Sequence, residues 1–214
     1  MKTKKTRIII TYIVLFTLLL GAILLSLYIG SVSIAPRQVF SVLTGHGTDA
    51  KAMQIILSIR LPRVLAAAIL GGALAVSGFL LQTFFRNPIA GPFVLGISSG
   101  AKLVVALAMI VGVSHGITMS SWFMIAMALI GSLLSMLFVL AVSKKVQEMS
   151  MLVVCGVMIG YICSAITDFC VTFADDSNIV NLHNWSMGSF SGMTWGNVAT
   201  AAAIVLPCLA AAFL

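Results

Sequence analysis

Arg60 and Arg63 stand on either side of Leu61-Pro62, where a polar segment gives way to a long apolar run. The planar guanidinium group of arginine can hold a carboxylate through two parallel hydrogen bonds, so this pair could recognise an acidic surface of a partner. Arginine beside an apolar run can instead be an anchor whose charged end reaches the lipid headgroups. The residue types allow both roles.

The same apolar run closes on a second polar cluster, Gln82 followed by Asn87-Pro-Ile-Ala90. Proline lacks an N–H group and disfavours the α conformation of the residue before it, so this cluster is predicted to end a helix. Gly72 and Gly78 would let neighbouring backbones approach closely. Together these residues predict one spanning helix, a sharp polar turn and the start of the next helix.

Two ionisable residues, Asp168 and Lys102, fall inside apolar runs. Charged groups within a membrane are costly, which makes each a candidate for function. Asp168 lies near the expected outer end of its run, where water can reach it, so local hydrogen bonding and a place on a substrate path both stay open. Lys102 lies near the expected cytoplasmic face and can extend towards the headgroups.

The sequence offers little metal or catalytic chemistry. Its histidines and cysteines are His46, His115, His183, Cys155, Cys163, Cys170 and Cys208. The histidines are far apart, and no cysteine pair has the C-x-x-C spacing of a zinc or redox site, so no metal site is expected. Walker, G-x-S-x-G and H-E-x-x-H motifs are missing from the sequence, so no catalytic residue is expected and any energy source must lie on another protein.

Composition limits the class of protein. The chain is 61% hydrophobic and 8% charged, with a mean hydropathy of +1.17. Soluble domains have about 45–50% apolar and about 25% charged residues, so an integral membrane protein is indicated. The apolar runs are continuous instead of alternating, which excludes the pattern of an outer-membrane barrel. The net charge of +7 comes from basic residues at the ends of apolar runs, which is typical of membrane topology and not of nucleic-acid binding.

The fold class expected is an all-α polytopic membrane protein, with a single transmembrane domain over residues 1–214. Runs of about 20 apolar residues cross a bilayer as helices. The predicted spans are 8–29, 61–85, 93–113, 122–142, 151–173 and 198–214.

The distribution of charge predicts orientation. Lysines precede the first span, and Lys144-Lys145 follows the fourth, as in cytoplasmic loops. Asp175-Asp176 and the segment from Ser31 to Ile59 are then outside, and the N-terminus is cytoplasmic. The last apolar run reaches Leu214 without a polar tail, so the chain is expected to be the N-terminal part of a longer subunit.

A series of motifs resembles one family. Arg60-Leu-Pro-Arg63, Gly72-Ala-Leu-Ala-Val-Ser-Gly78, the Asn-Pro turn and Leu95-Gly96 occur in the order found in permease subunits of binding-protein-dependent ABC importers for iron–siderophores, haem and vitamin B12. The resemblance continues in Val154-Cys-Gly156, Trp185-Ser-Met-Gly-Ser189 and Trp195. Ile89 departs from the family's usual leucine, which is a conservative change.

This resemblance implies a subunit with about ten spans, of which about six are present. It implies that Arg60 and Arg63 dock an extracytoplasmic substrate-binding protein. A cytoplasmic gate is implied at Asn87 and Ile89, and its second part at Met149 and Ser150. Asp168 remains a candidate for the substrate path.

The implied partners are a cytoplasmic ATPase, which binds the ATP, and a second permease subunit, identical or paralogous. The permease itself is expected to bind no cofactor and to lie in the bacterial inner membrane, in contact with lipid and not with nucleic acid. The cargo expected is a metal chelate, first a ferric siderophore, with haem and cobalamin open. A secondary transporter driven by an ion gradient would be expected to show charges at the membrane midplane, and an embedded enzyme would need a catalytic constellation. Both remain alternatives.

Overall fold

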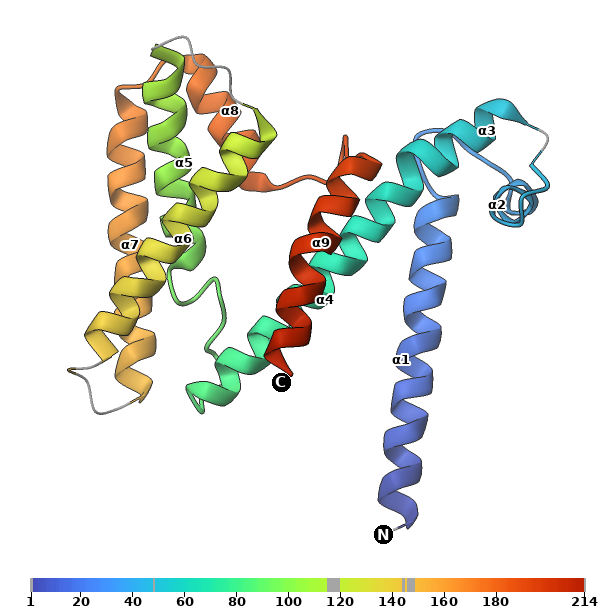
Figure 1. Ribbon diagram of the computed structural model, residues 1–214, viewed down its shortest axis with the longest axis horizontal. Helices are drawn as coiled ribbons and strands as arrows, with labels where there is room; N and C mark the ends of the chain where they lie inside the picture. Colours follow the sequence, from blue (N-terminus) through green and yellow to red (C-terminus); the bar gives the residue numbers. More distant parts are fainter. Residues whose placement is uncertain (1, 48, 115–119, 144, 146–148, 214) are drawn as a thin grey trace. The chain divides into compact units, whose positions relative to one another are not determined.

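The computed structural model describes residues 2–47, 49–114, 120–143, 145 and 149–213, and every regular element in these ranges is a helix (Figure 1). The elements are α1 (Lys2–Tyr28), α2 (Pro36–Leu43), α3 (Ala50–Gln54), a π-helical segment η1 (Ile55–Arg60), α4 (Leu61–Phe84), α5 (Ile97–Ser114), α6 (Ser121–Ser143), α7 (Met149–Thr172), α8 (Asp176–Met187) and α9 (Trp195–Ala212). His115 and Lys144, named above, lie outside the described residues.

Within the described ranges, five helices are long and apolar enough to cross a membrane. They are Lys4–Tyr28, Ala50–Phe84, Trp122–Val142, Met151–Thr172 and Trp195–Ala212. The apolar part of α5, Ile97–Gly112, is shorter. The prediction of an all-α polytopic membrane protein is therefore confirmed.

The third predicted span, 93–113, corresponds to α5, which begins at Ile97 and not at residue 93. Gly96 has a positive φ of 73°, which lies outside the right-handed helical region and prevents the helix from starting earlier.

The second long helix starts earlier than its predicted span. Residues 50–84 form one helical stretch of 35 residues, which is about 50 Å long, against about 30 Å for the hydrocarbon core. Asp49 begins it by accepting hydrogen bonds from Lys51 N at 2.9 Å and Ala52 N at 3.3 Å. The segment from Ser31 to Ile59, expected to lie outside the membrane, therefore contains α2, α3 and most of η1.

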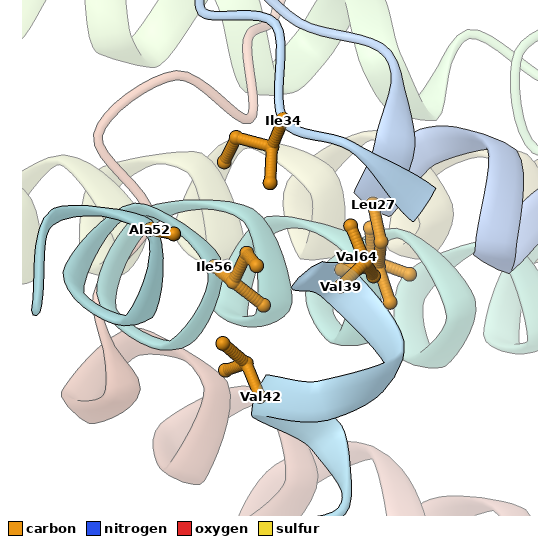
Figure 2. Close-up of a cluster of buried hydrophobic side chains, with 7 residues drawn as sticks. All are labelled: Leu27, Ile34, Val39, Val42, Ala52, Ile56 and Val64. Atoms are coloured by element: carbon orange, nitrogen blue, oxygen red, sulfur yellow. The ribbon is translucent and has the colours of Figure 1, made fainter. Parts of the chain in front are cut away.

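The chain divides into two compact units, residues 1–72 with 190–214 and residues 73–189. The core of the first unit gathers at one end of α1 and joins it to α2, α3, η1 and α4 (Figure 2). Its buried members are Leu27, Ile34, Val39, Val42, Ala52, Ile56 and Val64. This core fixes the end of α1 against the segment that carries Arg60.

The second unit is built on close contacts of α5 with α6 and α7. A Cβ at Gly100 would lie 2.8 Å from Gly131 O, and one at Gly96 would lie 2.7 Å from Gly156 O, so no larger residue fits at these crossings. A Cβ at Gly72 or Gly78 would meet nothing within 4 Å. The close-approach role predicted for that pair is therefore not seen among the described residues.

Candidate functional site

The first candidate site surrounds the two arginines, which the structure places in different environments. Arg60 is only 6% exposed, and its Nη1 donates to Leu27 O at 2.6 Å and Tyr28 O at 2.8 Å. Its Nη2 donates to Val32 O. Arg63 is exposed, and its Nε donates to Phe190 O at 3.2 Å. The predicted docking pair thus contains one buried and one exposed guanidinium, and no contact here tests docking itself.

Both arginines line a cleft of about 600 Å³ in the first unit. Its walls are mainly apolar and come from α1, η1, α4 and Phe190. Gly30 and Val32 lie at the same end as Arg60. The cleft therefore has a cationic end and an apolar body.

The π-helical segment η1 allows the helix to continue through Pro62. A proline in a helix removes one N–H donor, and its ring crowds the carbonyl four residues earlier, here that of Ser58. The wider turn relieves this crowding, and Leu61 N donates to Ile56 O, five residues back. In a regular α-helix, Leu61 N would donate to the Leu57 carbonyl, but here it donates to Ile56 O instead. The next residue, Pro62, has no N–H, so the helix backbone provides no donor for the Leu57 carbonyl.

Trp195, the first residue of α9, supplies the missing donor. Its indole Nε1 donates to Leu57 O at 2.9 Å. The sequence resemblance included Trp195 but gave it no role. Only the register shift before Pro62, which the sequence does not reveal, creates the need for a donor there.

The second candidate site is the turn after α4, which lies in the second unit. Asn87 Oδ1 accepts a hydrogen bond from Ile89 N at 2.9 Å, and Ala90 N donates to Asn87 O at 3.1 Å. Arg86 has a positive φ of 48°, which reverses the chain. The predicted polar turn is present, with Ile89 68% exposed.

This turn packs against the start of α7. Ala90 is fully buried in a cluster with Phe85, Leu95, Leu152 and Val153. The structure thus brings the two segments of the predicted gate together. Met149 and Ser150 begin α7, but their side chains are outside the described part, so the gate role is untested.

Asp168 lies on α7 with an exposed side chain, and its backbone carbonyl accepts from Thr172 Oγ1 at 2.9 Å. Lys102 lines a second cavity of about 490 Å³, with Ser98 and Ser99 beside it and Ser164 and Trp185 across it. Sequence reasoning placed Lys102 only near the headgroups. The serines on neighbouring helices were the available signal of a polar cavity.

Among the described residues, no group of three or more histidine, cysteine, aspartate or glutamate side chains could hold a metal ion. The residues around Trp185 form a short helix, α8, which ends at Met187 and is followed by Gly188 with a φ of 70°. Its position outside the membrane stays a prediction.

Comparison with known proteins gives consistent relatives. The vitamin B12 import system permease protein BtuC of Yersinia enterocolitica is 36% identical over 182 residues, which are 85% of this chain and 51% of that protein. The protein of the same name from Klebsiella pneumoniae is 36% identical over 178 residues, covering 83% and 50%. The chain thus spans about half the length of the curated relatives it matches.

A solved structure of a metal-chelate type ABC transporter in an inward-facing conformation has a TM-score of 0.76 and 27% identity to this chain. The match covers 92% of this chain and 59% of that one. The FecCD transport family matches residues 18–214, which is nearly the whole sequence. The chain therefore belongs to the FecCD transport family.

Proposed function

We propose that residues 1–214 form part of the permease subunit of an ABC importer that carries a metal chelate across the bacterial inner membrane. The observation that carries this proposal is the family match over residues 18–214. Five apolar helices of spanning length in the part of the chain that the structure describes support it. Transport then proceeds by alternating access, with the N-terminus of the chain in the cytoplasm.

The energy and the cargo come from partners. A cytoplasmic ATPase binds and hydrolyses ATP, an extracytoplasmic protein delivers the chelate, and a second permease subunit completes the path. The curated relatives named above import vitamin B12, so cobalamin is the first substrate to test. The ferric siderophore expected from the resemblance alone has no support in those names and is the second.

Two surfaces of the chain serve these steps. The exposed Arg63 faces the binding protein, where its guanidinium pairs with a carboxylate. The turn at Asn87–Ala90 and the start of α7 form the cytoplasmic gate. The packing of Ala90 against Leu152 and Val153 supports this. Because these side chains are in one buried cluster, a displacement of either segment would displace the other. Asp168, exposed on α7, lies on the substrate path.

The test is uptake by a bacterial strain that lacks its own permeases of this class. The permease containing residues 1–214 is expressed with an ATPase and a binding protein of the same importer, and uptake of radiolabelled cobalamin and of radioiron siderophores is measured. Uptake of one chelate that is lost when the ATPase is inactivated is expected. Uptake that persists without a functional ATPase and collapses with the ion gradient would instead identify a secondary transporter.

A further inference from the structure

We propose that the cavity around Lys102 is a binding site for an oxyanion, the carboxylate or phosphate group of the chelate that the importer carries. The cavity lies within the second unit, and its walls come from α5, α7, α8 and the segment before α5. The identity of the occupant rests on the importer function proposed above. The anion-binding chemistry rests only on residues of this chain and stands without it.

The walls of the cavity carry hydrogen-bond donors that the chain itself does not use. The side chain of Lys102 forms no hydrogen bond or ion pair with another described residue. The same holds for the hydroxyl groups of Ser98, Ser99 and Ser164 and for the indole N–H of Trp185. None of these atoms is both sealed from solvent and unpaired, so all of them are reachable by a molecule in the cavity.

The charge in the cavity is positive and uncompensated. Among the described residues that line it, none is an aspartate or glutamate. The whole chain has only five acidic residues, and Asp168, one helical turn beyond Ser164 on α7, is not part of the wall and forms no ion pair with Lys102. An ammonium group within a membrane is costly without a partner. An oxyanion supplies the missing charge and accepts hydrogen bonds from the hydroxyl groups.

Packing around the cavity holds the donors in place. A Cβ at Gly160 of α7 would lie 3.6 Å from Ser99 Oγ, so α5 and α7 are close at this wall. The third wall, α8, runs back beside α5 (Figure 1). Leu182 of α8 is buried in a cluster with Val105 and Ala106 of α5, and Trp185 packs against that cluster. Donors on packed helices are preorganised, which lowers the cost of binding.

The size and the lining of the cavity favour a polar group of the cargo over a lipid. Its volume of about 490 Å³ is within the range of about 300–1,000 Å³ for small-molecule sites. A phospholipid would need a long apolar groove for its acyl chains, and the apolar lining residues here are Phe93, Ala101 and Trp185. Cobalamin carries a phosphate diester, and haem and many siderophores carry carboxylates. The cavity therefore suits one anionic group of such a chelate.

The first arm of the test measures the electrostatic character of the cavity and needs no cargo. The permease that contains this chain is placed in phosphatidylcholine liposomes after all its native cysteines have been replaced by alanine. Ser186→Cys then adds one thiol at the cavity. Ser186 is exposed, and its hydroxyl already donates to His183 O at 2.9 Å, so no unused donor is lost. The rates of reaction with an anionic sulfonate and with a cationic trimethylammonium methanethiosulfonate reagent are compared.

We expect the ratio of the anionic to the cationic rate to fall about five- to tenfold in Lys102→Gln, because one unit charge nearby acts oppositely on the two reagents. Lys102→Arg should keep the ratio. Lys145→Gln is the matched control, since it makes the same change on an exposed lysine that does not line the cavity. An unchanged ratio in Lys102→Gln would overturn the anion site, because the ammonium would then be neutralised by another group. An equal fall in Lys145→Gln would also overturn it.

The second arm identifies the occupant in the complex of the permease with the ATPase of the same importer. The rate at which N-ethylmaleimide modifies Ser186→Cys is measured with added cobalamin, with the ferric complex of a carboxylate siderophore, and with the ferric complex of a neutral trihydroxamate. One of the two anionic chelates should protect the thiol, and Lys102→Gln should raise the concentration for half-protection at least fivefold. The neutral complex should not protect.

Three results would overturn the assignment of the cavity to the cargo. They are protection by neither anionic chelate, equal protection by the neutral complex, and protection that is unchanged in Lys102→Gln. Slower modification in liposomes that contain phosphatidylglycerol, without any chelate, would also overturn it and identify a lipid phosphate as the occupant. If no chelate is taken up in the transport test above, the proposed function fails, while the first arm still decides whether the cavity is an anion site.

Discussion

The hydrogen bond between Trp195 and Leu57 leads to a prediction that separates it from ordinary packing. Trp195→Phe removes the indole N–H and keeps most of the aromatic surface. With Pro62 in place, the Leu57 carbonyl of this variant has no hydrogen-bond donor, because Leu61 N is bound to Ile56 O and Pro62 has no N–H. In a Pro62→Ala background, residue 62 supplies a backbone N–H next to the same carbonyl. The cost of Trp195→Phe should therefore shrink.

The expected magnitude follows from the surroundings of the bond. A typical hydrogen bond contributes about 0.5–1.5 kcal/mol, and a buried carbonyl left unpaired costs about 1–3 kcal/mol. Trp195 is 48% exposed and begins α9, at the expected outer end of that helix, so the lower range applies. We expect Trp195→Phe to reduce the free energy of unfolding by about 0.5–1.5 kcal/mol and the coupling with Pro62→Ala to be up to about 1 kcal/mol.

The assay is a double-mutant cycle on the chain in mixed micelles, unfolded with a denaturing detergent and followed by circular dichroism. Trp122→Phe is the matched control, since it makes the same chemical change on an exposed residue of α6. Equal costs of Trp195→Phe with and without Pro62 would refute the argument, because the bond would then not depend on the donor that proline lacks. A cost no larger than that of Trp122→Phe would refute it as well.

Other predictions follow from the second unit and from the expected topology. Gly131→Ala should destabilise the chain by about 2 kcal/mol or more in the same unfolding assay, because the added Cβ would lie 2.9 Å from Ala101 Cα. Gly72→Ala, whose Cβ would meet nothing within 4 Å, should be neutral or stabilise the chain by up to about 1 kcal/mol. Asn87→Ala should remove the bond to Ile89 N and lower the free energy of unfolding by about 1 kcal/mol, while Asn87→Asp, which keeps the acceptor, should cost less; equal costs would contradict the turn argument. In a cysteine-free background, Ser33→Cys and Lys145→Cys should react with an impermeant thiol reagent from opposite sides of the membrane, and labelling of both in intact cells would overturn the topology.

The helices could be predicted from the sequence because hydropathy and helix length are local properties. Apolar runs of about 20 residues predicted helices close to α1, α6, α7 and α9. The start of the second long helix could not be found, because Pro62 is ordinarily a boundary signal. The π-helical turn before Pro62 accommodates the proline ring. The residue types of Ile55–Arg60 do not predict that turn.

The surroundings of the candidate functional residues could likewise be predicted where the contacts are local in sequence, and not where they are distant. The turn at Asn87–Ala90 was predictable, since its defining bond joins residues two apart. The surroundings of Arg60 were not, because its acceptors lie about 30 residues earlier in the chain. Arginine is suited equally to a carboxylate on a partner and to carbonyls at the end of a helix, so its type alone cannot choose between them.

The segment from Leu57 to Arg63 shows why motif residues need not share one role. Proline at 62 deprives the Leu57 carbonyl of a donor, and α9 provides one through Trp195. Arg60 ties the same helix to the end of α1, and Arg63 ties it to the Phe190 carbonyl before α9. Each of these bonds reaches a segment that the motif itself does not contain. A substitution at Arg60 that abolished transport would therefore not by itself identify a docking charge, since loss of the α1 contact predicts the same phenotype. Only a measurement that responds to charge at the surface, such as the salt dependence of association, can tell the two causes apart.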